Sequence, residues 1–151
     1  MGFRYTLDGS KATGTVAPFD LMTFIPGAGN IVKVVGFQFG SQSANALGPV
    51  TFDFGSYSGD ITGSALTLIP WDQLNALSPT TTAKYQTTGG NGSGFAYKMR
   101  WSAQQISHIG PVFFDKPFIL PRGGSPNIWG VRKTIGADNF VWSFELYIEE
   151  G

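Results

Sequence analysis

The segment that most constrains the fold is residues 140–150, just before the C-terminal glycine. Large apolar side chains alternate there with smaller or charged ones such as Glu145, and this is the period of a strand with one buried face. The predicted core residues are Phe140, Trp142, Phe144, Leu146 and Ile148. Burying each of them contributes about 1.5–3 kcal/mol before entropy is counted. We therefore expect a central strand of the core and not an edge strand.

Residues 31–39 form the second strongest predicted strand. Apart from Lys33 and Gln38, its side chains are apolar on both faces, as in strands that are covered on two sides. Its predicted core residues are Val35, Phe37 and Phe39. We expect this strand to lie beside the C-terminal one.

The rest of the chain reads as short strands joined by tight turns, because it contains 21 Gly, 9 Pro and 15% aromatic residues. Its 151 residues fit a single domain, residues 1–151. We predict an all-β fold, a two-sheet antiparallel sandwich that is jelly-roll-like. At most one short helix is expected, over residues 70–77, where Pro70 suits a first helical position. Residues 127–133 and the last strand are expected to form a terminal hairpin.

The first ten residues are expected to form a short strand or an extended N-terminal arm. Phe3, Tyr5 and Leu7 fall on one face, and turn residues follow from Asp8. We predict that the arm reaches a neighbouring subunit, with Phe3 and Tyr5 as assembly contacts. The alternative is an ordinary edge strand of the chain's own sheet.

The charge balance argues against two classes of partner. Ten Lys and Arg residues balance ten Asp and Glu residues, so no net field attracts nucleic acid or an anionic membrane. The low charge also leaves little to oppose self-association. Because the chain has no cysteine, it has neither disulfides nor thiolate metal sites. Neither a signal-peptide pattern nor an apolar run of about 18 residues occurs, so we expect a soluble protein that is not exported.

Few residues are suited to catalysis, and we predict no catalytic residue, no cofactor and no metal site. His108 is the single histidine, and no Gly-x-Ser-x-Gly segment accompanies it. Asp53 with Asp60 or Asp72 is the only loose group of carboxylates that could serve a glycosidase, and we expect these residues to cap turns instead. An isolated calcium ion between loops stays open as an alternative.

Two other features invite a ligand hypothesis. The glycine-rich residues 89–94 lack the Gly-Lys-Ser/Thr ending of a phosphate-binding loop, so we predict a flexible hairpin. Trp71 is the tryptophan that we expect to be exposed on a loop, either as an assembly contact or as a platform for a sugar ring. A carbohydrate-binding sandwich is therefore the second functional hypothesis, and a glycan-degrading enzyme is the third.

Several fragments near the two ends of the chain form a recognisable set. They are Tyr5-Thr6 with Gly9-Ser10, Val16-Ala17-Pro18, Gly29-Asn30-Ile31-Val32-Lys33-Val34 with Phe37 and Phe39-Gly40, Ile128-Trp129-Gly130-Val131, and Trp142-Ser143-Phe144 through Glu149-Glu150. In these fragments the chain resembles a group of small virion proteins of tailed bacteriophages. The resemblance implies a non-enzymatic β-sandwich protein that decorates or cements the capsid surface, or a minor capsid protein, made in the host cytoplasm. It also implies a homo-oligomer, most often a trimer, that attaches to the lattice of a major capsid protein.

Overall fold

The computed structural model describes residues 2–9, 18–41, 49–74, 78–104, 108–122, 125–135 and 142–151. Within these ranges the chain forms eleven strands and no helix. The strands are β1 (Phe3–Asp8), β2 (Phe19–Ile25), β3 (Val32–Ser41), β4 (Pro49–Tyr57), β5 (Thr62–Leu66), β6 (Ile69–Pro70), β7 (Thr82–Gly90), β8 (Ala96–Gln104), β9 (His108–Ile119), β10 (Ile128–Ile135) and β11 (Trp142–Glu150).

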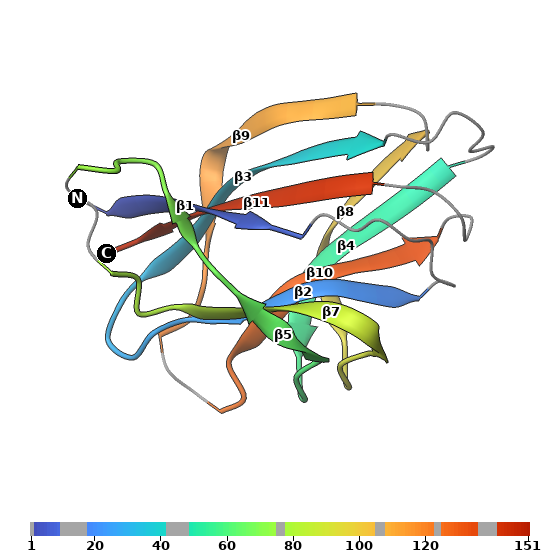
Figure 1. Ribbon diagram of the computed structural model, residues 1–151, viewed down its shortest axis with the longest axis horizontal. Coiled ribbons are helices and arrows are strands. Elements are labelled where there is room, and N and C mark those ends of the chain that lie inside the picture. The colour runs from blue at the N-terminus through green and yellow to red at the C-terminus, as the bar shows by residue number, and fades with distance from the viewer. Residues whose placement is uncertain are drawn as a thin grey trace.

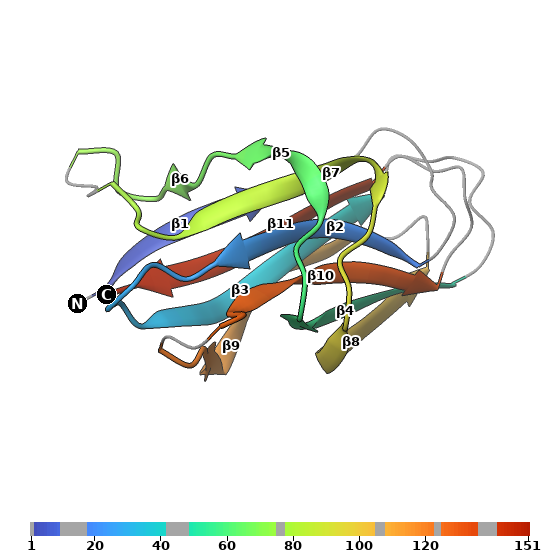
Figure 2. The same cartoon turned by 90° about the horizontal axis from the view of Figure 1, so that it is seen from below.

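The strands form two antiparallel sheets that pack face to face (Figures 1 and 2). The described strands of one sheet follow the order β6-β1-β11-β3-β9, and those of the other follow β5-β7-β2-β10-β4-β8. Without β5, β6 and β7, the order β1-β11-β3-β9 faces the order β2-β10-β4-β8, which is the strand order of a jelly roll. The predicted all-β sandwich is confirmed, and the segment β5–β7 is an insertion between β4 and β8.

The predicted helix does not form over residues 70–74. Ile69 and Pro70 instead pair with Thr6 and Tyr5 as β6. The backbone N–H of Trp71 then donates to the carbonyl of Arg4, which continues the strand contact. The remaining residues of the predicted helix, 75–77, lie outside the described ranges.

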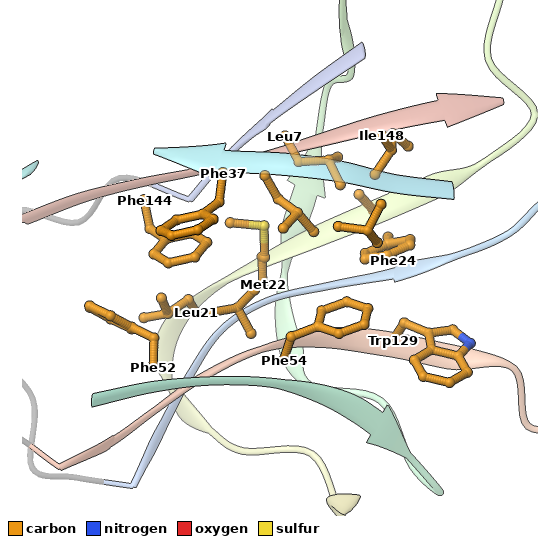
Figure 3. Packing of buried hydrophobic residues seen from close by; sticks show 14 of the residues in the cluster. Leu7, Leu21, Met22, Phe24, Phe37, Phe52, Phe54, Trp129, Phe144 and Ile148 are labelled. Carbon is orange, nitrogen blue, oxygen red and sulfur yellow. The ribbon is translucent and has the colours of Figure 1, made fainter. Parts of the chain in front are cut away.

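The last strand holds the central position that its sequence predicts. β11 lies between β1 and β3, and the side chains of Phe144, Leu146 and Ile148 are fully buried. The Phe144 ring lies 6.0 Å from the Phe37 ring between the sheets (Figure 3). Phe140 and the side chain of Trp142 lie outside the described part of the chain.

The predicted terminal hairpin is wrong. β10 belongs to the opposite sheet, where it pairs with β2 and β4, and it makes no ladder with β11. Each of the two strands has one fully buried face, with Val131 on β10 and Leu146 on β11 both inaccessible to solvent. Two such strands bury more surface when they face each other across the core than when they pair side by side in one sheet. The chain therefore crosses from one sheet to the other between β10 and β11.

A β-bulge changes the inward face of β3. The register with β11 shifts between Tyr147 and Ile148, and the register with β9 shifts between Val34 and Gly36. Val34 and Phe37 therefore both point into the core cluster, although they are three residues apart. Val35 lies at the bulge, where the inward face of β3 changes. Its side chain is 5% exposed, but it does not belong to the core cluster. Phe39 belongs to the cluster.

The N-terminal segment is a strand of the chain's own core and not an extended arm. β1 pairs with β11 from Phe3↔Glu150 to Asp8↔Glu145, and β6 lies on its other side. Tyr5 is 2% exposed, and Phe3 packs against the core cluster. The apolar face of this segment covers its own sandwich, which corrects the expectation that Tyr5 is an assembly contact. The contact of the partly buried Phe3 with a neighbouring subunit stays a prediction.

Candidate functional site

The outer face of the five-stranded sheet carries a continuous row of paired residues. Directly paired residues of antiparallel strands place their side chains on the same face. The row runs across all five strands as Ile69, Thr6, Tyr147, Gly36 and Phe113. Because Gly36 has no side chain, the rings of Tyr147 and Phe113 stack above it, with centroids 5.5 Å apart and planes inclined by 23°. A Cβ atom at Gly36 would lie 2.2 Å from the carbonyl oxygen of Val112.

Trp71 completes an aromatic cluster on this face, together with Phe113 and Tyr147. Its ring meets Tyr147 and Phe113 edge-on, at centroid distances of 5.5 and 5.8 Å. The indole Nε1–H donates to the hydroxyl of Thr6 over 2.9 Å. These contacts fix the ring, yet Trp71 is 41% and Phe113 52% exposed. Trp71 and Phe113 are thus the exposed members of this cluster, whereas Tyr147 is only 6% exposed.

A charged row lies beside the aromatic cluster. The carboxylate of Glu149 accepts from Arg4 Nε over 3.2 Å and from Lys33 Nζ over 3.0 Å. The guanidinium of Arg4 in turn lies over the Trp71 ring, 5.4 Å from its centroid. The hydrogen bond from Lys33, together with that from Arg4, lowers the pKa of Glu149 although its partial burial acts the other way. Glu149 therefore neutralises one of the two positive charges of this row.

A groove of about 420 Å³ opens where the aromatic cluster meets this charged row. The residues that line it are Gly2, Phe3, Arg4, Trp71, Asp72 and Glu149. Its volume falls within the range of small-molecule sites, and its walls combine apolar surface with a few charged groups. The carboxylate of Asp72 accepts from the backbone N–H of Leu74 over 2.9 Å, so the turn after β6 is held in place.

The three aspartates considered for a glycosidase are held by separate partners. Asp53 is buried, accepts two hydrogen bonds from Arg100 at 2.7 and 2.8 Å, and accepts one from Thr134. Asp60 contacts Lys84 and the hydroxyl of Thr23, whereas Asp72 lies in the groove.

Burial alone would raise the pKa of Asp53 and of Asp60. Hydrogen bonds, from Arg100 to Asp53 and from Lys84 to Asp60, outweigh that effect and hold both pKa values below the usual range. A general acid requires a raised pKa, so neither carboxyl is suited to that role.

His108 lies at the exposed start of β9, beside Gly40. Among the described residues, no group of three or more His, Cys, Asp or Glu side chains could hold a metal ion.

A buried charged cluster on the outer face of the other sheet was not predicted. Asp20 on β2 has no exposed surface, and its carboxylate accepts from Arg132 at 2.6 and 3.0 Å and from the Tyr57 hydroxyl at 2.6 Å. The guanidinium of Arg132 lies over the rings of Tyr57 and Phe95, at 5.6 and 4.4 Å. Burial, reinforced by the Asp20 charge, raises the pKa of Tyr57.

The glycine-rich loop contacts this cluster. The predicted hairpin is wrong, because β7 pairs with β2 and β5, whereas β8 pairs with β4. The backbone N–H of Gly92 donates to Asp20 over 2.8 Å, and the Asn91 side chain accepts from the Asp20 N–H. A Cβ atom at Gly92 would lie 2.6 Å from the Tyr57 ring, so only glycine fits there. The signal in the sequence was a charged residue inside each of two largely apolar strands, Asp20 in β2 and Arg132, next to Lys133, in β10, but nothing in the sequence pairs Asp20 with Arg132.

Comparison of this chain with protein-family models, with curated proteins and with solved structures finds no match. In the part of the chain that the structure describes, no helix is long and apolar enough to cross a membrane.

Proposed function

We propose that this chain is a non-enzymatic structural protein of a bacteriophage virion, which decorates or stabilises the capsid through protein–protein contacts. The observation that carries the proposal is the exposed apolar surface on the outer face of the five-stranded sheet. Ile69, Trp71, Phe113 and Ile119 are 48%, 41%, 52% and 63% exposed, respectively. Ile119 lies on this face because its direct partner is Lys33, which contacts Glu149 there.

A surface of this kind suits a protein partner. Side chains such as Trp71 and Phe113 supply large contact areas, and the rim around them is polar. The surrounding charges are paired within the chain, so its attraction to a capsid protein would rest on apolar contact more than on net charge. The jelly-roll strand order, which also occurs in viral capsid domains, and the resemblance of the chain ends to phage virion proteins support the same proposal.

The lowered pKa values and fixed partners of Asp53 and Asp60 favour a contact role over hydrolysis by this pair. In this proposal the chain forms a homotrimer around a capsid symmetry axis, because closed symmetry hides apolar surface that low charge leaves unprotected.

The test is quantitative mass spectrometry of purified phage particles whose genome encodes the chain. We expect a copy number that is a fixed fraction of the major capsid protein. Light scattering of the purified chain should give three times the monomer mass. Absence from washed particles, or a copy number that varies between preparations, would overturn the proposal.

A variant pair then tests the surface. Phe113→Glu places a charge in the exposed aromatic cluster and should abolish sedimentation with purified capsids. Tyr97→Ala is the matched control, since Tyr97 is an aromatic side chain that is 59% exposed on β8 of the opposite sheet. Equal capsid binding by both variants would mean that the contact lies elsewhere.

A further inference from the structure

We propose that the groove beside Trp71 binds an uncharged pyranose ring, so that the chain carries a saccharide site in addition to its assembly surface. This inference does not rest on the proposed virion function, because a free oligosaccharide needs only the groove. It rests on three observations: an immobilised aromatic wall, charged groups of both signs, and the room that Gly2 leaves at the edge of the groove.

The aromatic wall is preorganised. A sugar ring stacks on an aromatic face through its C–H groups, and the affinity improves when that face needs no ordering on binding. The Trp71 ring is held by its hydrogen bond to Thr6 and by edge contacts to Tyr147 and Phe113, and it remains 41% exposed. Little side-chain entropy is therefore lost when a ligand binds.

The polar groups of the groove match hydroxyl groups, which both donate and accept. Arg4 contacts Glu149 through Nε, and its guanidinium carries further donors on the Nη atoms. The carboxylates of Glu149 and Asp72 are acceptors, and each ionised carboxylate has about four acceptor positions. Neighbouring sugar hydroxyls could thus bind a donor and an acceptor at once.

The charge balance selects an uncharged ligand. Arg4 contributes one positive charge to the lining, and Asp72 and Glu149 contribute two negative charges. Lys33, which contacts Glu149, offsets the second negative charge. A phosphate or sulfate would meet two carboxylates without a surplus of cations, so an anionic ligand is disfavoured.

Gly2 shapes the outer edge of the groove. A Cβ atom on Gly2 would lie 2.5 Å from Cγ of Glu149, so any larger residue would press on the carboxylate side chain that the ligand needs. The experiment therefore uses protein that keeps Gly2 and carries no added tag.

The probes are uncharged tetrasaccharides of glucose, galactose, mannose and N-acetylglucosamine, with inorganic sulfate as the anionic comparison. Binding is followed by titration with detection of the indole N–H resonances in ¹H–¹⁵N spectra. We expect at least one tetrasaccharide to bind saturably and to shift the Trp71 indole resonance, while sulfate leaves it unchanged. No saturable binding by any tetrasaccharide up to about 10 mM would overturn the proposal.

Variants locate the site. Trp71→Ala should weaken binding by about tenfold or more, because it removes the aromatic wall. Asp72→Asn keeps an oxygen that can accept from the Leu74 N–H and removes the negative charge of the carboxylate. That variant should weaken binding by about threefold to tenfold. If Trp71→Ala does not fold, Asp72→Asn and the wild-type indole shift still decide the outcome.

Tyr97→Ala is again the matched control, because Tyr97 is an exposed aromatic residue with the guanidinium of Arg100 5.0 Å from its ring centroid, and it does not line the groove. It should leave saccharide binding unchanged. A tetrasaccharide that shifts other resonances but not Trp71, or that binds the Trp71→Ala variant with wild-type affinity, would refute the site.

Discussion

Removing the Asp20 carboxylate should destabilise the chain far more than removing the Asp53 carboxylate. Both aspartates lie on the outer face of the six-stranded sheet, and each accepts two hydrogen bonds from one arginine. The two ion pairs differ mainly in the solvent access of the arginine. The Arg132 side chain is 17% exposed, whereas that of Arg100 is 49% exposed. The pair therefore tests whether the burial of the cation, and not the number of hydrogen bonds, sets the cost.

The magnitude follows from what each substitution leaves behind. Asp20→Ala leaves three donor groups without their acceptor, namely the Arg132 guanidinium, the Tyr57 hydroxyl and the Gly92 N–H. Removing one partner of a buried ion pair costs about 3–5 kcal/mol, because the other charge stays buried and uncompensated. Asp53→Ala leaves an arginine that water can hydrate, so its loss should be clearly smaller.

The assay is urea unfolding at pH 7, followed by tryptophan fluorescence and circular dichroism. A domain of this size has a total stability of about 5–15 kcal/mol, so Asp20→Ala could fail to fold, and Asp20→Asn then serves as the milder variant. Arg132→Met, alone and combined with Asp20→Ala, completes a double-mutant cycle, and the double variant should lose less than the sum of the two single losses. Equal losses for Asp20→Ala and Asp53→Ala would refute the reasoning.

Three further predictions concern the core, β1 and pH. Phe144→Ala should lower the free energy of unfolding in urea by about 3–5 kcal/mol, since its ring packs on three other rings. Glu145→Ala should lower it by under about 1 kcal/mol. A small loss for Phe144→Ala would contradict the packing. Deleting residues 2–8 should abolish the thermal unfolding transition, because it removes a paired strand with buried Tyr5, and a folded truncated chain would contradict that assignment. Burial would raise the pKa of Glu150, but hydrogen bonds from Thr80 and Thr81 lower it, so its contribution is present above the ordinary carboxyl pKa of about 4.3 and is lost as pH falls below it. As the pH falls below about 4, the urea concentration at the unfolding midpoint should therefore decrease, and it should decrease less steeply in Glu150→Gln. Parallel pH profiles of the two proteins would exclude this role.

Local periodicity predicted the parts of the fold that local sequence determines. The alternation around Phe144, Leu146 and Ile148 identified the central strand, because a buried face on one strand leaves a period of two. The neighbouring strand was also found, and its predicted core residues Val35, Phe37 and Phe39 are buried, but the bulge that places Val35 outside the core cluster was not predicted, since it depends on the partner strands. The place of β10 was missed because alternation does not say which sheet a strand joins.

The candidate site was beyond local reasoning except for Trp71, whose loop position suggested exposure. Arg4 and Glu149 are 145 residues apart in the sequence, and Asp20 and Arg132 are 112 apart. Their contacts depend on which strands become neighbours, and many charge pairings are compatible with one sequence. Gly36 gave no signal either, although its missing side chain allows Tyr147 and Phe113 to stack.

The insertion between β4 and β8 connects the fold to the candidate site. The eight jelly-roll strands already bury Phe37, Phe52 and Phe144, so the core does not depend on the short strand β6. β6 nevertheless extends the five-stranded sheet beyond β1, and the residue that follows it is Trp71. Arg4 and Glu149, which meet because the first and last strands pair, supply the charged side of the same groove. The groove therefore combines the pairing of the first and last strands with a short strand that is added at the edge of the sheet. A change in the β6 turn can alter what binds there while the sandwich stays intact.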